Sequence, residues 1–142
     1  MDGHLLENIP LFAKLPHEQL DELAGVLRQR RYRHGETVFR AGDEGTEFYV
    51  IQVGAVHFAF NDARGHEVSL GELGTGEFFG EVALLDGGPR TETATARGDT
   101  ALLAMSRHDF MDFLERRPTS TAYIVSVLGA RLREAMYRLQ QA

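Results

Sequence analysis

An acid and an arginine flank a short apolar turn in FGEVALLDGGPRT, which spans residues 79–91. Gly80 lets the backbone approach a ligand closely, and residues 81–85 predict one helical turn whose first N–H groups are left for an anion. Arg90 offers paired donors for phosphate oxygens, whereas Glu81 would repel a phosphate and should accept a hydrogen bond from a sugar hydroxyl. The pair therefore predicts a ribose phosphate as ligand.

The predicted ligand is small, because the sequence offers little to neutralise a polyphosphate. The chain has no GxxxxGK[ST] motif and no carboxylate set suited to magnesium, so we expect no metal cofactor. It also has no cysteine, which excludes disulfides, thiolate-bound zinc, iron–sulfur clusters and a thiol nucleophile.

The elements that must position this turn fall into three parts. Helical spacing of leucines predicts an N-terminal helix at about 15–31. The basic run RQRRYR at 28–33 would then lie at the solvated C-terminal end of this helix. Short β-rich runs separated by turn signals predict an antiparallel β-roll at about 32–105, in the α+β class. The remainder, about 106–142, predicts two helices, the second beginning at Pro118. The predicted strand runs are 37–39, 48–51, 56–60, 67–70 and 101–104.

Length and charge limit what the chain does. Its 142 residues suit one domain, and its net charge of -6 lacks the basic footprint of direct nucleic-acid binding. It has no run of about 18 apolar residues and no secretory leader, so we expect no membrane segment and a cytoplasmic location.

The ordered residues FGE, an apolar turn and then GGPRT resemble the phosphate-binding cassette of the cyclic nucleotide-binding domain family, as found in the catabolite activator and in protein kinase A regulatory subunits. The resemblance covers most of the chain and implies an eight-stranded roll, no catalytic chemistry, and cAMP as ligand with cGMP as the alternative. It implies that Glu81 binds the ribose and Arg90 the cyclic phosphate. The other implied ligand residues are Phe79, Gly80, Val82, Ala83, Thr91, Thr93, Phe58, Leu70, Arg131 and Met136.

The sequence departs from the family pattern in two places. Glu92 stands where a small residue is usual, and strand alternation predicts that its side chain points away from the anion while Thr91 and Thr93 share the other face. Ala135 and Met136 stand where the catabolite activator has hydroxyls that read adenine. Apolar packing of Met136 or Tyr137 on the base is the expected substitute.

Two other classes of protein stay open. A cupin-like metal enzyme would need a histidine pair with a glutamate, which the histidine positions do not supply, and a ligand-free structural relative would keep only the roll. If the family reading holds, the last helix should respond to ligand, with Arg131 reaching Glu81, and pass the signal to an effector domain absent from this chain. The apolar seam of that helix packs either on its own domain or on a second copy as a homodimer.

Overall fold

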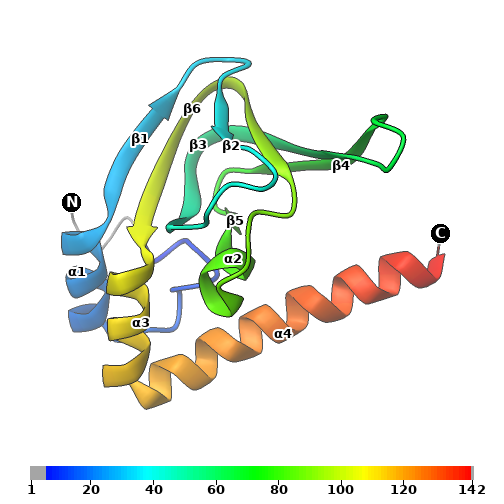
Figure 1. The fold of residues 1–142 in the computed structure, drawn as a ribbon. Helices are drawn as coiled ribbons and strands as arrows, with labels where there is room; N and C mark the ends of the chain where they lie inside the picture. Colours follow the sequence, from blue (N-terminus) through cyan, green and yellow to red (C-terminus); the bar gives the residue numbers. More distant parts are fainter. Residues whose placement is uncertain (1–5, 142) are drawn as a thin grey trace. The chain divides into compact units, whose positions relative to one another are not determined.

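The computed structural model describes residues 6–141 and divides the chain into two compact units. The helical unit takes the chain up to Gly25 and from His108 onward, and the roll unit takes Val26–Arg107. Figure 1 shows the helices and strands of each. The predicted fold class, an antiparallel β-roll with one N-terminal helix and two C-terminal helices, is confirmed.

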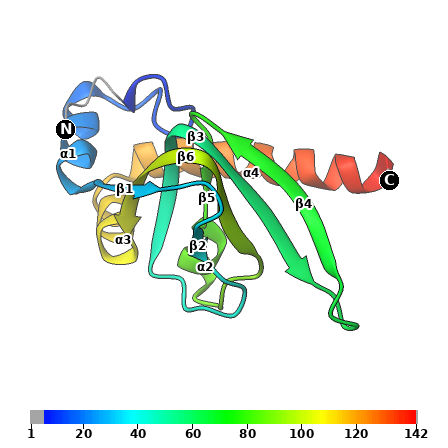
Figure 2. The same ribbon diagram turned by 90° about the horizontal axis from the view of Figure 1, so that it is seen from above.

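Six strands form the sheet of the roll unit. In pairing order they are β1 (Arg28–Tyr32), β6 (Thr93–Ser106), β3 (Glu47–Asn61) and β4 (Glu67–Gly74), while β2 (Thr37–Phe39) pairs with β6 and β5 (Phe78–Phe79) with β3. Every pairing is antiparallel. Figure 2 shows the long β3–β4 hairpin extending past β6.

The strand count differs from the implied eight because β3 and β6 are long continuous strands. The runs 48–51 and 56–60 both lie in β3, where a turn was predicted between them. Gly54 has φ 104° and lies within a segment where the β3–β6 register shifts, so the chain bulges at this point and continues in the same strand. The other three predicted runs, 37–39, 67–70 and 101–104, are confirmed in β2, β4 and β6.

The core of the roll is an apolar cluster on one face of the paired strands. β3 and β6 contribute alternating buried residues to it, as expected where one face of a strand is buried. Its aromatic members stack or meet edge to face with ring centroids 5.1–6.1 Å apart. The cluster consists of Phe39, Tyr49, Ile51, Val56, Phe58, Phe79, Ala94, Leu102 and Ala104.

The basic run at 28–33 was predicted as a helix end, and this prediction is wrong. Helix α1 (His17–Val26) ends before the run, and Arg28–Tyr32 forms β1, paired with β6 along its length. β1 lies at an edge of the sheet and is largely exposed, where charged side chains protect the strand from pairing with other chains. Pairing with β6 therefore overrides the local helical preference of arginine and glutamine.

The helical unit contains α1 except its last residue Val26, α3 (Arg107–Arg116) except its first residue, and α4 (Pro118–Gln141). Glu22 of α1 accepts hydrogen bonds from Arg116 and from Arg117, the latter at 2.8 Å. The hydroxyl of Tyr123 donates to the Pro10 carbonyl, so the start of α4 is joined to the N-terminal segment. Within residues 6–141, no helix is long and apolar enough to cross a membrane.

Candidate ligand-binding site

The residues predicted to bind an anion lie together in the roll unit, at 79–93, which we call the cassette. The predicted helical turn is confirmed as α2 (Glu81–Asp86). Gly80 before it has φ 86° and Gly87 after it φ 75°, both in the left-handed region that favours glycine. These two glycines fix where the turn begins and ends, and so place Glu81 at its first position.

Arg90 is nearly fully buried, with 5% of its surface exposed. Its Nη1 donates to the Gly80 carbonyl at 2.7 Å and its Nη2 donates to the Glu47 carbonyl. Its Nε is buried and has no hydrogen-bond partner among the described residues. A buried unpaired donor costs about 1–3 kcal/mol, and more when charged, so an acceptor that reached this N–H would relieve that cost.

Aromatic rings surround the Arg90 side chain. Its guanidinium carbon lies 4.1 Å from the centroid of the Phe39 ring and 5.9 Å from that of Tyr49, within the range of cation–π attraction. Burial lowers the pKa of Arg90, although a guanidinium keeps its proton in proteins. Burial also raises the pKa of Tyr49, so that phenol stays neutral. The site is therefore a fixed cation in a largely apolar surrounding.

Gly45 allows the cassette to close around Arg90. A Cβ added at Gly45 would lie 2.4 Å from the Ala83 Cβ and 3.3 Å from the Arg90 Cζ. Only a glycine lets the 44–45 segment approach α2 this closely. Ala83 itself is buried, whereas Val82, its neighbour on α2, is 56% exposed.

The loop after Arg90 differs from the prediction. Residues 91–92 form a bend and β6 begins only at Thr93, so strand alternation does not govern Glu92. The hydroxyl of Thr91 donates to the Glu92 carboxylate. Thr93 instead accepts a hydrogen bond from the Ala41 N–H at 3.0 Å. The strand alternation from which Glu92 was predicted to point away from the anion is therefore absent at residues 91–92, and the roles of Thr91 and Thr93 stay predictions.

The remaining predicted residues of the roll unit occupy contrasting environments. Phe79 and Phe58 are buried and meet edge to face, with centroids 5.1 Å apart. Leu70 on β4 is 56% exposed and lies where the β3–β4 register shifts. Glu81, the predicted ribose ligand, is half-buried at the first position of α2.

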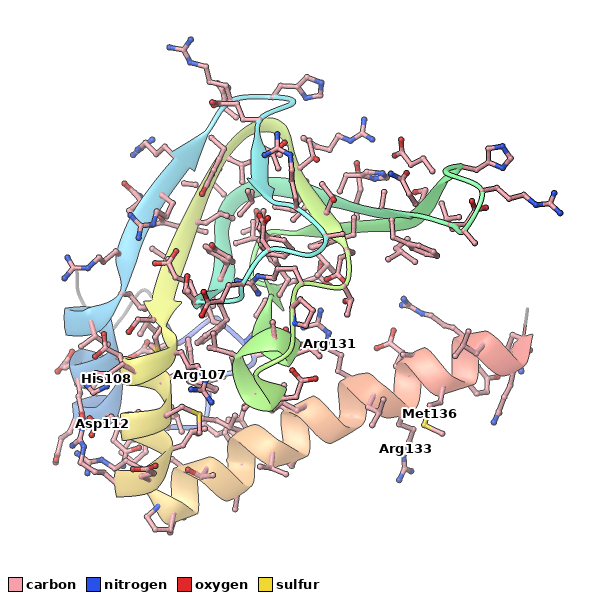
Figure 3. The ribbon with its side chains drawn as sticks, viewed as in Figure 1. Arg107, His108, Asp112, Arg131, Arg133 and Met136 are labelled. Atoms are coloured by element: carbon pink, nitrogen blue, oxygen red, sulfur yellow. The ribbon has the colours of Figure 1, made fainter. Side chains whose placement is uncertain are left out.

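Arg131 and Met136 belong to α4 in the helical unit. Five residues turn an α-helix by about 140° beyond one full rotation, so the two side chains leave α4 in different directions. Figure 3 shows Arg131 projecting from one side and Met136 from another. The sequence assigned them to different groups, Arg131 to Glu81 and Met136 to the base, and both assignments stay predictions.

Several residues of the site were not predicted. Glu47 contributes a backbone carbonyl, Gly45 a close approach and Phe39 a ring face, and each lies more than 40 residues before Arg90. Arg107, at the start of α3, donates from its Nε to the Leu84 carbonyl of α2 at 2.9 Å (Figure 3). No local motif marks these contacts.

The described part of the chain, residues 6–141, brings no three His, Asp or Glu side chains together as metal ligands. The cassette instead presents a buried guanidinium, backbone groups, two threonine hydroxyls and the carboxylates of Glu81 and Glu92. These groups suit an anion with few charges.

Comparison with known proteins agrees with this geometry. The model of the family described as "Cyclic nucleotide-binding domain" matches residues 29–117, more than half of the chain. The chain belongs to the cyclic nucleotide-binding domain family. The cyclic AMP receptor protein of Thermus thermophilus is 37% identical over 130 residues, which cover 92% of this chain and 60% of that protein. The chain thus spans about three fifths of that relative.

Solved structures show the same fold. The catabolite activator protein of Thermus thermophilus superposes with a TM-score of 0.82 at 37% identity, covering 93% of this chain and 62% of that one. The N-terminal domain of a transcriptional regulator from Streptomyces coelicolor gives 0.77 at 35% identity, covering 92% and 94%. The regulatory subunit of a cAMP-independent protein kinase A from Trypanosoma brucei gives 0.82 at 25% identity, covering 97% and 48%.

Proposed function

We propose that the roll unit binds a cyclic purine nucleotide, cAMP in preference to cGMP, as a sensor without catalytic activity. The observation that carries this proposal is the buried Arg90, whose Nη atoms hold the cassette and whose Nε is left without an acceptor. A singly charged cyclic phosphate supplies that acceptor and matches the single cation. Regulatory relatives such as the Thermus cyclic AMP receptor protein support the assignment.

The ribose is assigned to Glu81. Glu81 is the first residue of α2 and directly follows Gly80. Because Arg90 donates to the Gly80 carbonyl, the guanidinium lies next to the peptide group that joins Gly80 to Glu81. A carboxylate accepts hydroxyl hydrogen bonds and repels phosphate, which separates the two roles. The backbone N–H groups of Val82 and Ala83 and the Thr91 hydroxyl complete the proposed set.

The base is read loosely in this proposal. Ala135 and Met136 offer no side-chain hydrogen bond to adenine, so contact with the base is apolar. We expect cAMP and cGMP to differ in affinity by less than about 100-fold, because ratios of ~10⁴ need buried polar groups that one ligand leaves unpaired. A competition titration with the two nucleotides checks this; a ratio near ~10⁴ would show that an unidentified polar residue reads the base.

Signal output is assigned to α4. Binding shifts a population only if the ligand interacts differently with two states of the protein, and the proposed Arg131–Glu81 pair supplies such a difference. An effector outside this sequence receives the change. A homodimer is proposed through the apolar residues of α4, of which Val125, Leu132, Met136, Tyr137 and Leu139 are each more than half exposed.

Direct titration with cAMP tests the proposal against both alternatives. Saturable binding that is lost in Arg90→Ala supports a cyclic nucleotide sensor. Absence of binding would favour a structural relative or another ligand, as the similar Trypanosoma subunit is described as cAMP-independent. Stoichiometric metal in the purified protein would favour the cupin-like enzyme.

A further inference from the structure

Glu92 occupies the hydroxyl that the proposed ligand needs. Thr91 donates its only hydroxyl proton to the Glu92 carboxylate, while Thr93 is engaged with the Ala41 N–H. Because residues 91–92 form a bend outside β6, no strand geometry forces these two side chains apart. In this structure a carboxylate of the chain itself therefore stands where a phosphate oxygen would accept from Thr91.

The charge of Glu92 also reaches Arg90. Burial is the largest influence on the Arg90 pKa and lowers it, and Glu92 is among the groups that act in the opposite direction, together with Tyr49, Glu47 and Asp43. Glu92 is half-buried, so its interaction with the guanidinium is only partly screened. A ligand phosphate at Arg90 would feel the same carboxylate as a repulsion.

We propose that Glu92 is a charge filter of the site, which favours a monoanionic cyclic phosphodiester over a dianionic phosphate monoester. This inference rests on the proposed function. A diester has one negative charge, whereas a monoester carries about 1.5–2 at neutral pH. Repulsion from a fixed carboxylate grows in proportion to ligand charge. The free-energy penalty that Glu92 imposes on a monoester is therefore up to twice the penalty that it imposes on a diester. Both ligands must also displace Glu92 from Thr91, a cost that they share.

Glu92→Gln tests the filter, since it removes the charge and keeps the length of the side chain. Calorimetric titration of the full chain with cAMP and with 5′-AMP gives four dissociation constants. We expect the variant to bind cAMP about 1.4-fold to fivefold more tightly, the range for an exposed charge pair. The gain for 5′-AMP should be larger, up to the square of that factor, or about twofold to 25-fold. The preference for cAMP over 5′-AMP should therefore fall, by up to about fivefold.

Glu67→Gln is the matched control, because it changes the net charge equally at an exposed position of β4 in the hairpin. It should leave both affinities unchanged within about twofold, and raising the salt concentration should shrink the effect of Glu92→Gln. Thermal unfolding of each variant confirms that the fold is kept.

Three outcomes would overturn the inference. Equal gains for the two ligands would mean that Glu92 competes for Thr91 without selecting charge. Unchanged affinities in Glu92→Gln, with wild-type binding of cAMP intact, would remove Glu92 from the site and leave the proposed function standing. Absence of cAMP binding by the wild-type protein would overturn the inference and the proposed function together, whether or not Glu92→Gln binds it.

Discussion

The cassette and the distal part of α4, residues 125–141, are constructed in opposite ways. In the cassette, Arg90 and Ala83 are each 5% exposed and the guanidinium is held by two carbonyls. Along distal α4, Leu132 is 62% and Leu139 76% exposed. The contacts of the cassette are already made within the roll unit, whereas distal α4 has apolar surface still to bury. The proposed binding site is thus already packed, and the proposed response would depend on the exposed apolar residues of distal α4.

Arg90→Ala should give the largest effect, because it removes the one buried cation of the cassette. We expect affinity for cAMP to fall about tenfold to more than 100-fold, since charge-assisted hydrogen bonds contribute about 1.5–3 kcal/mol each. Arg90→Lys should recover only part of the loss, because an ammonium cannot make the same fixed set of donations. Calorimetry measures the cAMP affinity of both variants. If Arg90→Ala keeps the wild-type affinity, the nucleotide binds at a site other than the cassette.

Arg131→Ala asks whether the two regions are coupled. If Arg131 pairs with Glu81 when nucleotide is bound, the change should weaken binding about 5–150-fold, the usual span of coupling energies. Hydrogen exchange over 125–139 should then be slower with saturating cAMP than without it.

Arg133→Ala is the matched control on the same helix, since its side chain leaves α4 on a different side from Arg131 (Figure 3). It should keep the wild-type affinity. If hydrogen exchange over 125–139 is the same with and without cAMP, and Arg131→Ala binds as tightly as the wild type, nucleotide binding is not coupled to α4.

Gly45→Ala tests how closely the cassette is packed. The new Cβ would overlap Ala83 at 2.4 Å, so α2 or Arg90 must shift, and overpacking of this kind costs about 1–3 kcal/mol of unfolding free energy. Gly25→Ala in α1 meets no atom within 4 Å and should instead stabilise by about 0.5–1 kcal/mol. Thermal unfolding of both variants shows whether each change lowers or raises the unfolding free energy. If Gly45→Ala leaves it unchanged, the cassette is loosely packed.

The sequence predicts the fold class, α2 and the place of Arg90 because each has a local signal: periodicity, two flanking glycines, or an ordered motif. It fails at β1, where RQRRY has no strand pattern and only pairing with β6 decides the structure. The rule of strand alternation also does not apply at Glu92, because β6 begins only at the next residue, Thr93. The carbonyl of Glu47 is 43 positions from Arg90, and no local pattern reports such a contact.

Leu139→Ser should have the smallest effect and sharpens the comparison most. Leu139 is 76% exposed, so if distal α4 is free in solution, the unfolding free energy should change by no more than about 0.5 kcal/mol. Ile124→Ala, on the same helix but with 1% of its surface exposed, is the positive control and should cost about 2–5 kcal/mol. Denaturant unfolding at two protein concentrations measures both. A second copy covers this part of α4 if two results are found together: Leu139→Ser loses nearly as much unfolding free energy as the control, and the unfolding free energy of the wild type rises with protein concentration. The second result is expected because the stability of a dimer follows mass action.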